Sequence, residues 1–300
     1  AANPFGFHRG RRWNEHSVDL NRNVLSPAQF AAFSDPAREE AVDYERFTSF
    51  LNPTRPWLPL LDDVRVLVNA AYLILTVGFV NVKRVLVTGQ YHNPRGVYYG
   101  GTELEPSHEQ LFSFLAAHCA APESVAVVDV HTGLGPSGVD TLMTMELEED
   151  TLYSIFGTPS PSSFLFGAMS DTSGGSDGAA AGYDKSFGHT SAYLPLMHAR
   201  PDVSGWTRGF EVTQEFGTIP GVLVAKALIA ENSVWHHAPE VHGRLRTWAA
   251  QASRAAFYVE TPQWEESVVQ RGVTVFGQVS RFLAQEGNEG KLKAIASEEV

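Results

Sequence analysis

The chain has 300 residues, and 43% of them are hydrophobic, a proportion typical of a folded globular protein rather than a disordered one. Its formal net charge of −12 argues against partners that need a basic surface, so we expect no nucleic acid and no membrane among them. The single cysteine, Cys119, excludes an intramolecular disulfide, and with no basic-then-apolar leader in view we expect a cytoplasmic location.

The first part of the chain is predicted to be mostly helical. Asn-Pro and several glycines predict a loop near the start. The apolar run over 64–82 contains Arg65, Asn69 and Asn81, so it is typical of a core helix rather than a membrane span. The predicted elements of this part are a loop over 3–23, helices over 26–50 interrupted at Pro27 and Pro36, a helix over 63–79, a strand over 83–89 and a helix over 107–119.

The stretch VAVVDVHTGLGPSG, over 125–138, organises the rest of the chain. Its four small apolar residues predict a strand buried on both faces, as in the middle of a parallel sheet. The strand is expected to end at His131, where a glycine-bounded turn begins, and ligands bind at such carboxyl ends in open α/β sheets. Asp129 lies two residues earlier, so its side chain should point to the same side as the imidazole.

The second half of the chain predicts a loop, another strand and further helices. Residues 157–182 are rich in Gly, Ser, Pro and Ala, which indicates a long loop that is either a functional lid or an insert. A strand over 206–217 should place Glu211, Thr213 and Glu215 on one face. Residues 222–248 are expected to be helical in two parts divided near Pro239, and 268–281 to form a strand or a helix.

These patterns predict an α/β fold with a mixed, largely parallel central sheet flanked by helices. Because we see no internal repeat and no linker, we expect a single domain over residues 1–300.

Four arginines stand close together near the start of an otherwise acidic chain: Arg9, Arg11, Arg12 and Arg22. A solvated basic loop and an anion-binding wall are both compatible with this spacing, because guanidinium groups bind carboxylates through two parallel hydrogen bonds.

Four segments, in this order, resemble the zinc carboxypeptidase family with the carboxypeptidase-A-like fold. They read NPFGF…RRWNEHSVDLNRN, GQYHNPRGVYYGGTE, DVHTGLG and TQEFGT. The resemblance is closest to a bacterial branch of predicted zinc carboxypeptidases whose substrates are poorly defined. It implies a metal-dependent hydrolase that cleaves an amide bond next to a free carboxylate, in a peptide or an N-acyl amino acid.

The resemblance also implies a role for each matching residue. His131 matches a zinc ligand, and Glu215 matches the carboxylate that activates the zinc-bound water. Arg12 matches the arginine that stabilises the developing oxyanion. Asn21 and Arg22 match the pair that holds the terminal carboxylate of the substrate. We expect these side chains to converge on one hollow.

Some of these assignments have alternatives. Arg11 is a neighbouring alternative to Arg12, and Glu211 is a weaker alternative to Glu215. The family also uses a tyrosine near the substrate, for which Tyr183 and Tyr193 are both candidates.

The chain departs from the family at the zinc site. The family takes its first two zinc ligands from a His-x-x-Glu motif that precedes the NPFGF segment, and this chain has no such motif there. A catalytic zinc usually needs three protein ligands, so the site is expected to be incomplete and the sheet to lack its first strands. His237 to Glu240 has the same spacing but the wrong order, and Pro239 prevents a regular helix there.

Three functions remain open at this point. The leading one is a zinc carboxypeptidase-like hydrolase, with weak or absent activity unless the missing ligands are supplied. The second is a deacylase of N-acyl amino acids. The third is a metal-free protein that binds peptide or amino-acid carboxylates through Arg12 and Arg22. The sequence does not reveal the substrate side chain or the oligomeric state.

Overall fold

The computed structural model describes residues 2–144, 146–160, 163–167, 169–170, 183–184, 186–238, 243–285 and 287–295. The chain divides into two compact units, each built from three stretches. Unit 1 comprises Ala1–His108, Ser186–His189 and Pro220–Tyr258, and unit 2 comprises Glu109–Lys185, Thr190–Ile219 and Val259–Val300. The expectation of a single domain over 1–300 stays a prediction.

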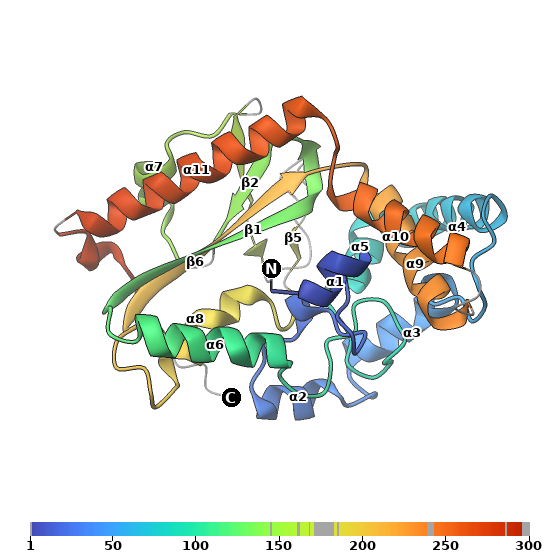
Figure 1. Cartoon of the computed structure of the whole chain (residues 1–300), viewed down its shortest axis with the longest axis horizontal. Helices are drawn as coiled ribbons and strands as arrows, with labels where there is room; N and C mark the ends of the chain where they lie inside the picture. Colours follow the sequence, from blue (N-terminus) through green and yellow to red (C-terminus); the bar gives the residue numbers. More distant parts are fainter. Residues whose placement is uncertain are drawn as a thin grey trace. The chain divides into compact units, whose positions relative to one another are not determined.

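Among the described residues of unit 1, the regular elements are helices joined by turns and loops, with an isolated bridge between Gln90 and Tyr99 (Figure 1). Its helices are α1 (Pro4–Arg9), the 3₁₀ turn η1 (Leu20–Arg22), α2 (Pro27–Phe33), α3 (Glu39–Leu51), α4 (Leu61–Val77), α5 (Phe79–Val87), α9 (Gly221–His237) and α10 (Gly243–Phe257). The predicted division of the last helical region into two parts is confirmed by α9 and α10. A small apolar cluster around Leu25, Phe30 and Tyr91 forms part of its core.

Local sequence explains where these helices begin. Ser26 caps α2 by a capping box with Gln29, and Pro27 occupies the first helical position. The predicted loop over 3–23 is wrong at its start, because the Asn3 side chain accepts a hydrogen bond from the Gly6 amide and initiates α1.

The predicted strand over 83–89 is also wrong, because these residues belong to α5 and the turn that follows it. A short apolar run fits either a strand or a helix, and here the chain bends by 118° after α4 and continues as a helix. Among the described residues, no single helix is long and apolar enough to cross a membrane, although α4 and the end of α5 pass that test as a bent pair.

Unit 2 contains the sheets and the helices around them. Its elements are most of α6 (Pro106–Cys119), β1 (Ser124–Ser137), β2 (Asp140–Met143), α7 (Glu149–Phe156), β3 (Phe164–Gly167), β4 (Met169–Ser170), β5 (Tyr183–Asp184), η3 (Thr190–Ala192), α8 (Tyr193–His198), β6 (Arg208–Gly217), α11 (Pro262–Ala284) and η4 (Asn288–Lys291).

The main sheet has the strand order β1-β6-β2-β3. The pairs β1–β6 and β2–β3 are parallel, and the pair β2–β6 is antiparallel. Figure 1 shows α7 and α11 along one side of these strands and α8 along the other. The predicted fold class, an α/β protein with a mixed and largely parallel sheet flanked by helices, is therefore confirmed.

Strand β1 differs from the prediction in two ways. It does not end at His131 but continues to Ser137, past an irregular register between Gly133 and Ser137. Its first six residues are half-buried rather than buried on both faces, because β1 stands at one end of the strand order.

The core of unit 2 confirms the predicted alternation along β6. Phe210 and Val212 pack against α7 and α11 in one apolar cluster, which also includes Leu142, Ile155, Phe156, Val275, Val279 and Phe282. The segment left open as strand or helix is the helix α11. Beneath it, Asp140 is fully buried and accepts hydrogen bonds from Arg271 and Gln214, which connects β2, β6 and α11.

Candidate active site

The candidate active site of unit 2 begins with two residues that face each other on neighbouring strands. His131 on β1 and Glu215 on β6 are register partners in the parallel pair. The imidazole Nδ1 lies 3.7 Å from Glu215 Oε2, and Nε2 lies 2.5 Å from Asp129 Oδ2. The predicted proximity of Asp129 and His131 is therefore confirmed, and the ring stands between two carboxylates. About a fifth of the His131 side chain is exposed, so small molecules can reach it.

Backbone atoms beyond His131 hold Glu215 in place. The amide of Leu134 donates a hydrogen bond to Glu215 Oε1 at 2.9 Å. Thr218 bonds the Gly133 carbonyl through both its amide and its hydroxyl, which fixes the end of β6 against β1. One carboxylate oxygen is therefore held by the chain, while the other faces the imidazole.

Two residues from the segment before β6, Thr190 and Tyr193, also lie near Asp129. The hydroxyl of Thr190 donates a hydrogen bond to Asp129 Oδ2. Tyr193 is buried nearby, and burial raises the pKa of its phenol, with the charge of Asp129 as a further cause. Of the two tyrosine candidates, Tyr193 is thus the one that the structure brings close to this site, and nothing is described of the Tyr183 side chain.

Glu211 lies behind the site and has a different character from Glu215. Burial raises its pKa well above the ordinary value, and the charges of Asp129 and Glu146 act in the same direction. The Thr213 hydroxyl donates to Glu211 Oε1 at 2.7 Å, which opposes the shift. Glu211 is only 1% exposed, whereas Glu215 faces the partly exposed His131, so this geometry favours Glu215 over Glu211 as the base.

The arginines predicted to bind substrate lie in unit 1 around one aromatic ring. The guanidinium carbons of Arg12 and Arg22 lie 5.1 Å and 5.5 Å from the centre of the Tyr98 ring. Arg12 Nε also pairs with Asp19 Oδ2 at 2.7 Å, and its side chain is about one fifth exposed. Two cations thus lie over the same aromatic ring, and Arg12 is paired with Asp19.

Arg22 is much less accessible than Arg12. It is only 4% exposed, and its guanidinium donates to the carbonyl oxygens of Val87 and Asn21. Burial lowers its pKa, Asp19 opposes this change, and Arg12 adds to it. Asn21 Oδ1 is buried and has no hydrogen-bond partner among the described residues.

The Arg11 side chain is buried in the interior of unit 1. Its Nε lies 2.7 Å from Glu231 Oε1 on α9, and its guanidinium stacks on Trp235 at 3.7 Å. Burial lowers the pKa of Arg11 to about 10 and raises the pKa of Glu231 to about 7, while their mutual attraction opposes both changes. Because both side chains are almost fully buried, Arg12 is better placed than Arg11 to meet a ligand.

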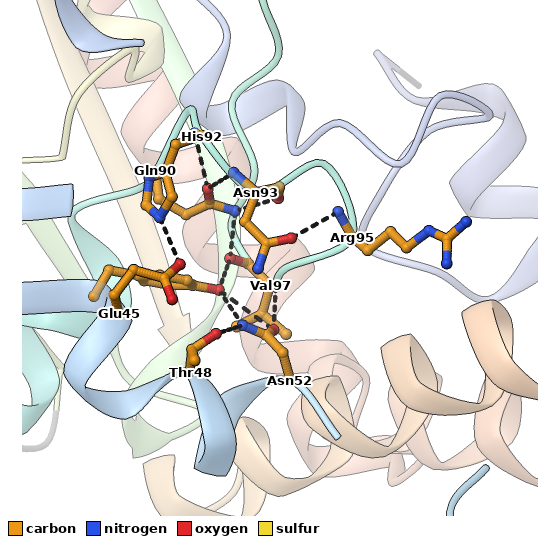
Figure 2. A network of polar contacts seen from close by, with 9 residues as sticks. Glu45, Thr48, Asn52, Gln90, His92, Asn93, Arg95 and Val97 are labelled. Carbon is orange, nitrogen blue, oxygen red and sulfur yellow. Dashed lines mark hydrogen bonds and ion pairs between the residues drawn. The ribbon is translucent and has the colours of Figure 1, made fainter. Parts of the chain in front are cut away.

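The loop that carries the second resembling segment is held by polar contacts (Figure 2). Gln90 bonds the backbone of Asn93 in both directions at 2.8 Å. Asn52 Oδ1 accepts from the Val97 amide at 3.0 Å, and His92 pairs with Glu45 at 2.8 Å. The same loop carries Tyr98 at a positive φ of 59°.

The donor set in the described residues does not fit a catalytic zinc. The imidazole of His131 is oriented by a carboxylate, as metal-bound histidines usually are. The described part of the chain nevertheless contains no group of three His, Cys, Asp or Glu side chains that could hold a metal ion. Glu240, the second member of the alternative motif at His237, lies outside the described residues.

Comparisons with known proteins give one match. A family model described as "Protein of unknown function (DUF2817)" matches residues 1–271. No curated protein and no solved structure matches the chain.

Proposed function

The chain belongs to the DUF2817 family, and we propose that it is a hydrolase that cleaves an amide bond next to a free carboxylate. Asp129, His131 and Glu215 are the proposed acid–base residues. The proposed substrates are peptides with a free C-terminus, with N-acyl amino acids as the alternative. Dependence on zinc, which the resemblance to zinc carboxypeptidases implies, is part of the test below.

One observation supports this proposal above the others. A partly exposed imidazole stands between two carboxylates near the end of the regular parallel pairing of β1 with β6, which runs to Gly133 and Gly217. Ligands of open α/β sheets bind at this position. A histidine that is oriented by one carboxylate and faces another is equipped to accept and return a proton.

Amide hydrolysis needs a base that takes a proton from the attacking water and an acid that protonates the leaving nitrogen. Glu215 is the proposed acceptor of the water proton, because the Leu134 amide holds its Oε1 while its Oε2 faces the His131 imidazole. His131 is the proposed donor to the leaving nitrogen, and Asp129 keeps its ring in one orientation. The proton taken up by Glu215 then passes to His131, whose Nδ1 lies 3.7 Å from Glu215 Oε2, so one water is consumed in each cycle and both side chains regain their starting protonation states.

The test is an assay of the purified chain on C-terminal peptides and N-acyl amino acids, with added zinc and after chelation. We expect His131→Asn and Glu215→Gln to lower kcat/KM by about 10²-fold or more, the usual contribution of a general acid or base. Bound zinc is measured in parallel, and we expect His131→Asn to lower it if the protein binds the metal.

The matched control is His118→Asn, because His118 belongs to the same unit and contacts Phe114 rather than the site. This variant should keep the wild-type rate. Wild-type protein that hydrolyses none of these substrates in either condition, or a Glu215→Gln variant as active as wild type, would contradict the proposal.

A second function is supported by the arginines of unit 1. Arg12 and Arg22 lie over the same ring, that of Tyr98, and Arg12 pairs with Asp19. Such a cluster favours binding of a free carboxylate without catalysis. Calorimetry with acetylated amino acids should then show binding that chelators leave unchanged and that Arg12→Gln weakens. Arg38→Gln, which removes another arginine stacked on an aromatic ring, is the control.

A further inference from the structure

Helix α4 presents an apolar face that no described residue covers. Its exposed large side chains include Leu75 at 85%, Tyr72 at 63% and Val64 at 61%. The helix packs on unit 1 through its other side, where Val66 and Ala70 are buried. The full set of large apolar side chains at least 40% exposed on or just before this helix is Leu58, Leu60, Leu61, Val64, Leu67, Val68, Tyr72 and Leu75.

The charged residues within this face, Asp62, Asp63 and Arg65, all stand near its start, and Arg65 pairs with Asp62. The sequence contains no Asp, Glu, Lys or Arg from residue 66 to residue 82. The two carboxylates in the first turn of α4 are already paired, Asp62 with Arg55 and Asp63 with Lys226. The face is therefore a continuous apolar surface rather than a set of scattered exposed residues.

The size of the face is that of an interface. The largest apolar patch on a typical monomer covers about 300–600 Å², and a standard interface buries about 800 Å² on each partner. From their exposed fractions, which add up to about five fully exposed residues, the eight side chains together expose an area on the order of 700 Å². This area exceeds what solubility alone tolerates and approaches what a stable pair of proteins needs.

The positions along the helix are symmetric about Val68. Leu61 and Leu75 lie seven residues to either side, and Val64 and Tyr72 lie four residues to either side. Spacings of three and four residues keep these side chains on one stripe of the helix. A two-fold axis at Val68 would thus set leucine against leucine and the large Tyr72 against the small Val64, which is the self-complementarity that a symmetric dimer requires.

We propose that α4 is the interface through which two copies of this chain associate, as an antiparallel helix pair centred on Val68. In such a pair, Leu61 meets the partner's Leu75, and the helix dipoles run in opposite directions. A lipid surface is the less favoured occupant, because interfacial helices carry Lys and Arg on their polar face and this chain has a net charge of −12.

The first experiment measures the mass of the full chain in solution over a range of concentrations. Wild type should be a dimer that dissociates on dilution, and Val68→Lys should be a monomer at every concentration. Val68 and the control position Val273 are both exposed, so both lysine variants should fold. The control is Val273→Lys on α11, where Val273 is 70% exposed on another apolar stripe, and this variant should still dimerise.

The second experiment tests the antiparallel geometry by disulfide formation in a Cys119→Ser background. Val68→Cys should cross-link to itself, because it lies at the two-fold axis. Leu75→Cys alone should not, because seven residues of helix separate it from the axis by about 10 Å, and a disulfide needs Cα atoms about 4–7 Å apart. A mixture of Leu75→Cys and Leu61→Cys should form the mixed dimer.

Three results would overturn the proposal. The first is a wild-type chain that is a monomer at all concentrations, and the second is a Val68→Lys variant that dimerises like wild type. The third is self-cross-linking of Leu75→Cys, which indicates a parallel pair. A sedimentation assay with phosphatidylcholine vesicles distinguishes the alternative, since vesicle binding lost in Val68→Lys without any dimer would identify a bilayer as the occupant.

Discussion

At the scale of the residue, the chemistry of this protein depends on how carboxylates and cations are paired. His131 sits between Asp129 and Glu215, and only the contact with Asp129 is a close hydrogen bond. The orientation of the ring, and therefore which nitrogen carries the proton, is set by Asp129. This residue should act through His131 rather than on the substrate itself.

Asp129→Asn tests this role. The amide keeps the shape of the side chain but removes its charge, which permits the wrong tautomer of His131. We expect kcat/KM to fall by about 10²–10⁴-fold and its pH profile to shift, while thermal unfolding changes little. An unchanged pH profile at a reduced rate would indicate a merely structural role for Asp129.

The raised pKa of Glu231 should make the free energy of unfolding depend on pH. Burial raises its pKa to about 7 in the folded state, above the ordinary value of 4.5. The folded protein then binds a proton that the unfolded chain has released, so the free energy of unfolding should fall as pH rises from about 4.5 to about 7. Urea denaturation at several pH values should show this decline in wild type and a weaker one in Glu231→Gln.

Glu39→Gln is the control for this measurement, because Glu39 is exposed on the first turn of α3. It should leave the decline as it is in wild type. A wild-type stability that rises between pH 5 and pH 7, with Glu231→Gln parallel to it, would show that other groups dominate the pH dependence.

Part of the site was predictable from local sequence at this scale. The alternation along two strands places Asp129 beside His131, and Glu215 on the polar face of β6. Thr190 and Glu231 were not predictable, because their partners are distant in the chain and no local pattern marks them. The common position of Arg12, Arg22, His131 and Glu215 in one hollow stays a prediction.

At the scale of the element, a short apolar run in the sequence does not show whether it forms a strand or a helix. Residues 83–89 have the composition of a buried strand but form part of α5, since a run of this length does not distinguish the two periods. The strand β6 and the helix α6 were predicted correctly, and β1 was predicted as a strand but with the wrong end and burial, because stretches bounded by turn residues are less ambiguous in type than in extent.

The contact between β2 and α11 predicts a large loss of stability when it is broken. Asp140 is fully buried, and Arg271 pairs with it at 2.9 Å. Arg271→Met removes the cation and leaves a buried carboxylate, at a cost of about 3 kcal/mol in the free energy of unfolding. Denaturant titration measures this loss. Arg281→Met on the exposed side of the same helix should change the free energy by less than about 0.5 kcal/mol.

Substitution by alanine at Gly89 and at Gly272 should change the free energy of unfolding in opposite directions. Gly89 follows α5 with φ of +96°, and an added Cβ would stand 2.7 Å from Arg22 Cδ. Gly89→Ala should therefore destabilise unit 1, by about 1–2 kcal/mol. Gly272 lies inside α11 with open space around it, so Gly272→Ala should stabilise the protein by up to about 1 kcal/mol. Thermal unfolding of both variants tests this contrast, and equal shifts would contradict it.

At the scale of the whole molecule, the sequence predicted the α/β class but not the division into two units. No change in composition marks that division, since each unit is assembled from three separate stretches of chain. The association through α4 also belongs to this scale. Its palindromic spacing was visible in the sequence, but only the structure shows that this side of the helix is exposed.

The interleaving of the two units has a consequence for synthesis. Arg11 lies in the first stretch of unit 1, whereas Glu231 and Trp235, which enclose it, belong to the last. During synthesis, the first stretch of unit 1 therefore cannot complete its packing until the last stretch, which ends at Tyr258, has left the ribosome. Unit 1 can therefore complete its core only late in synthesis, and we expect chains cut at either end of α9 to fail to fold.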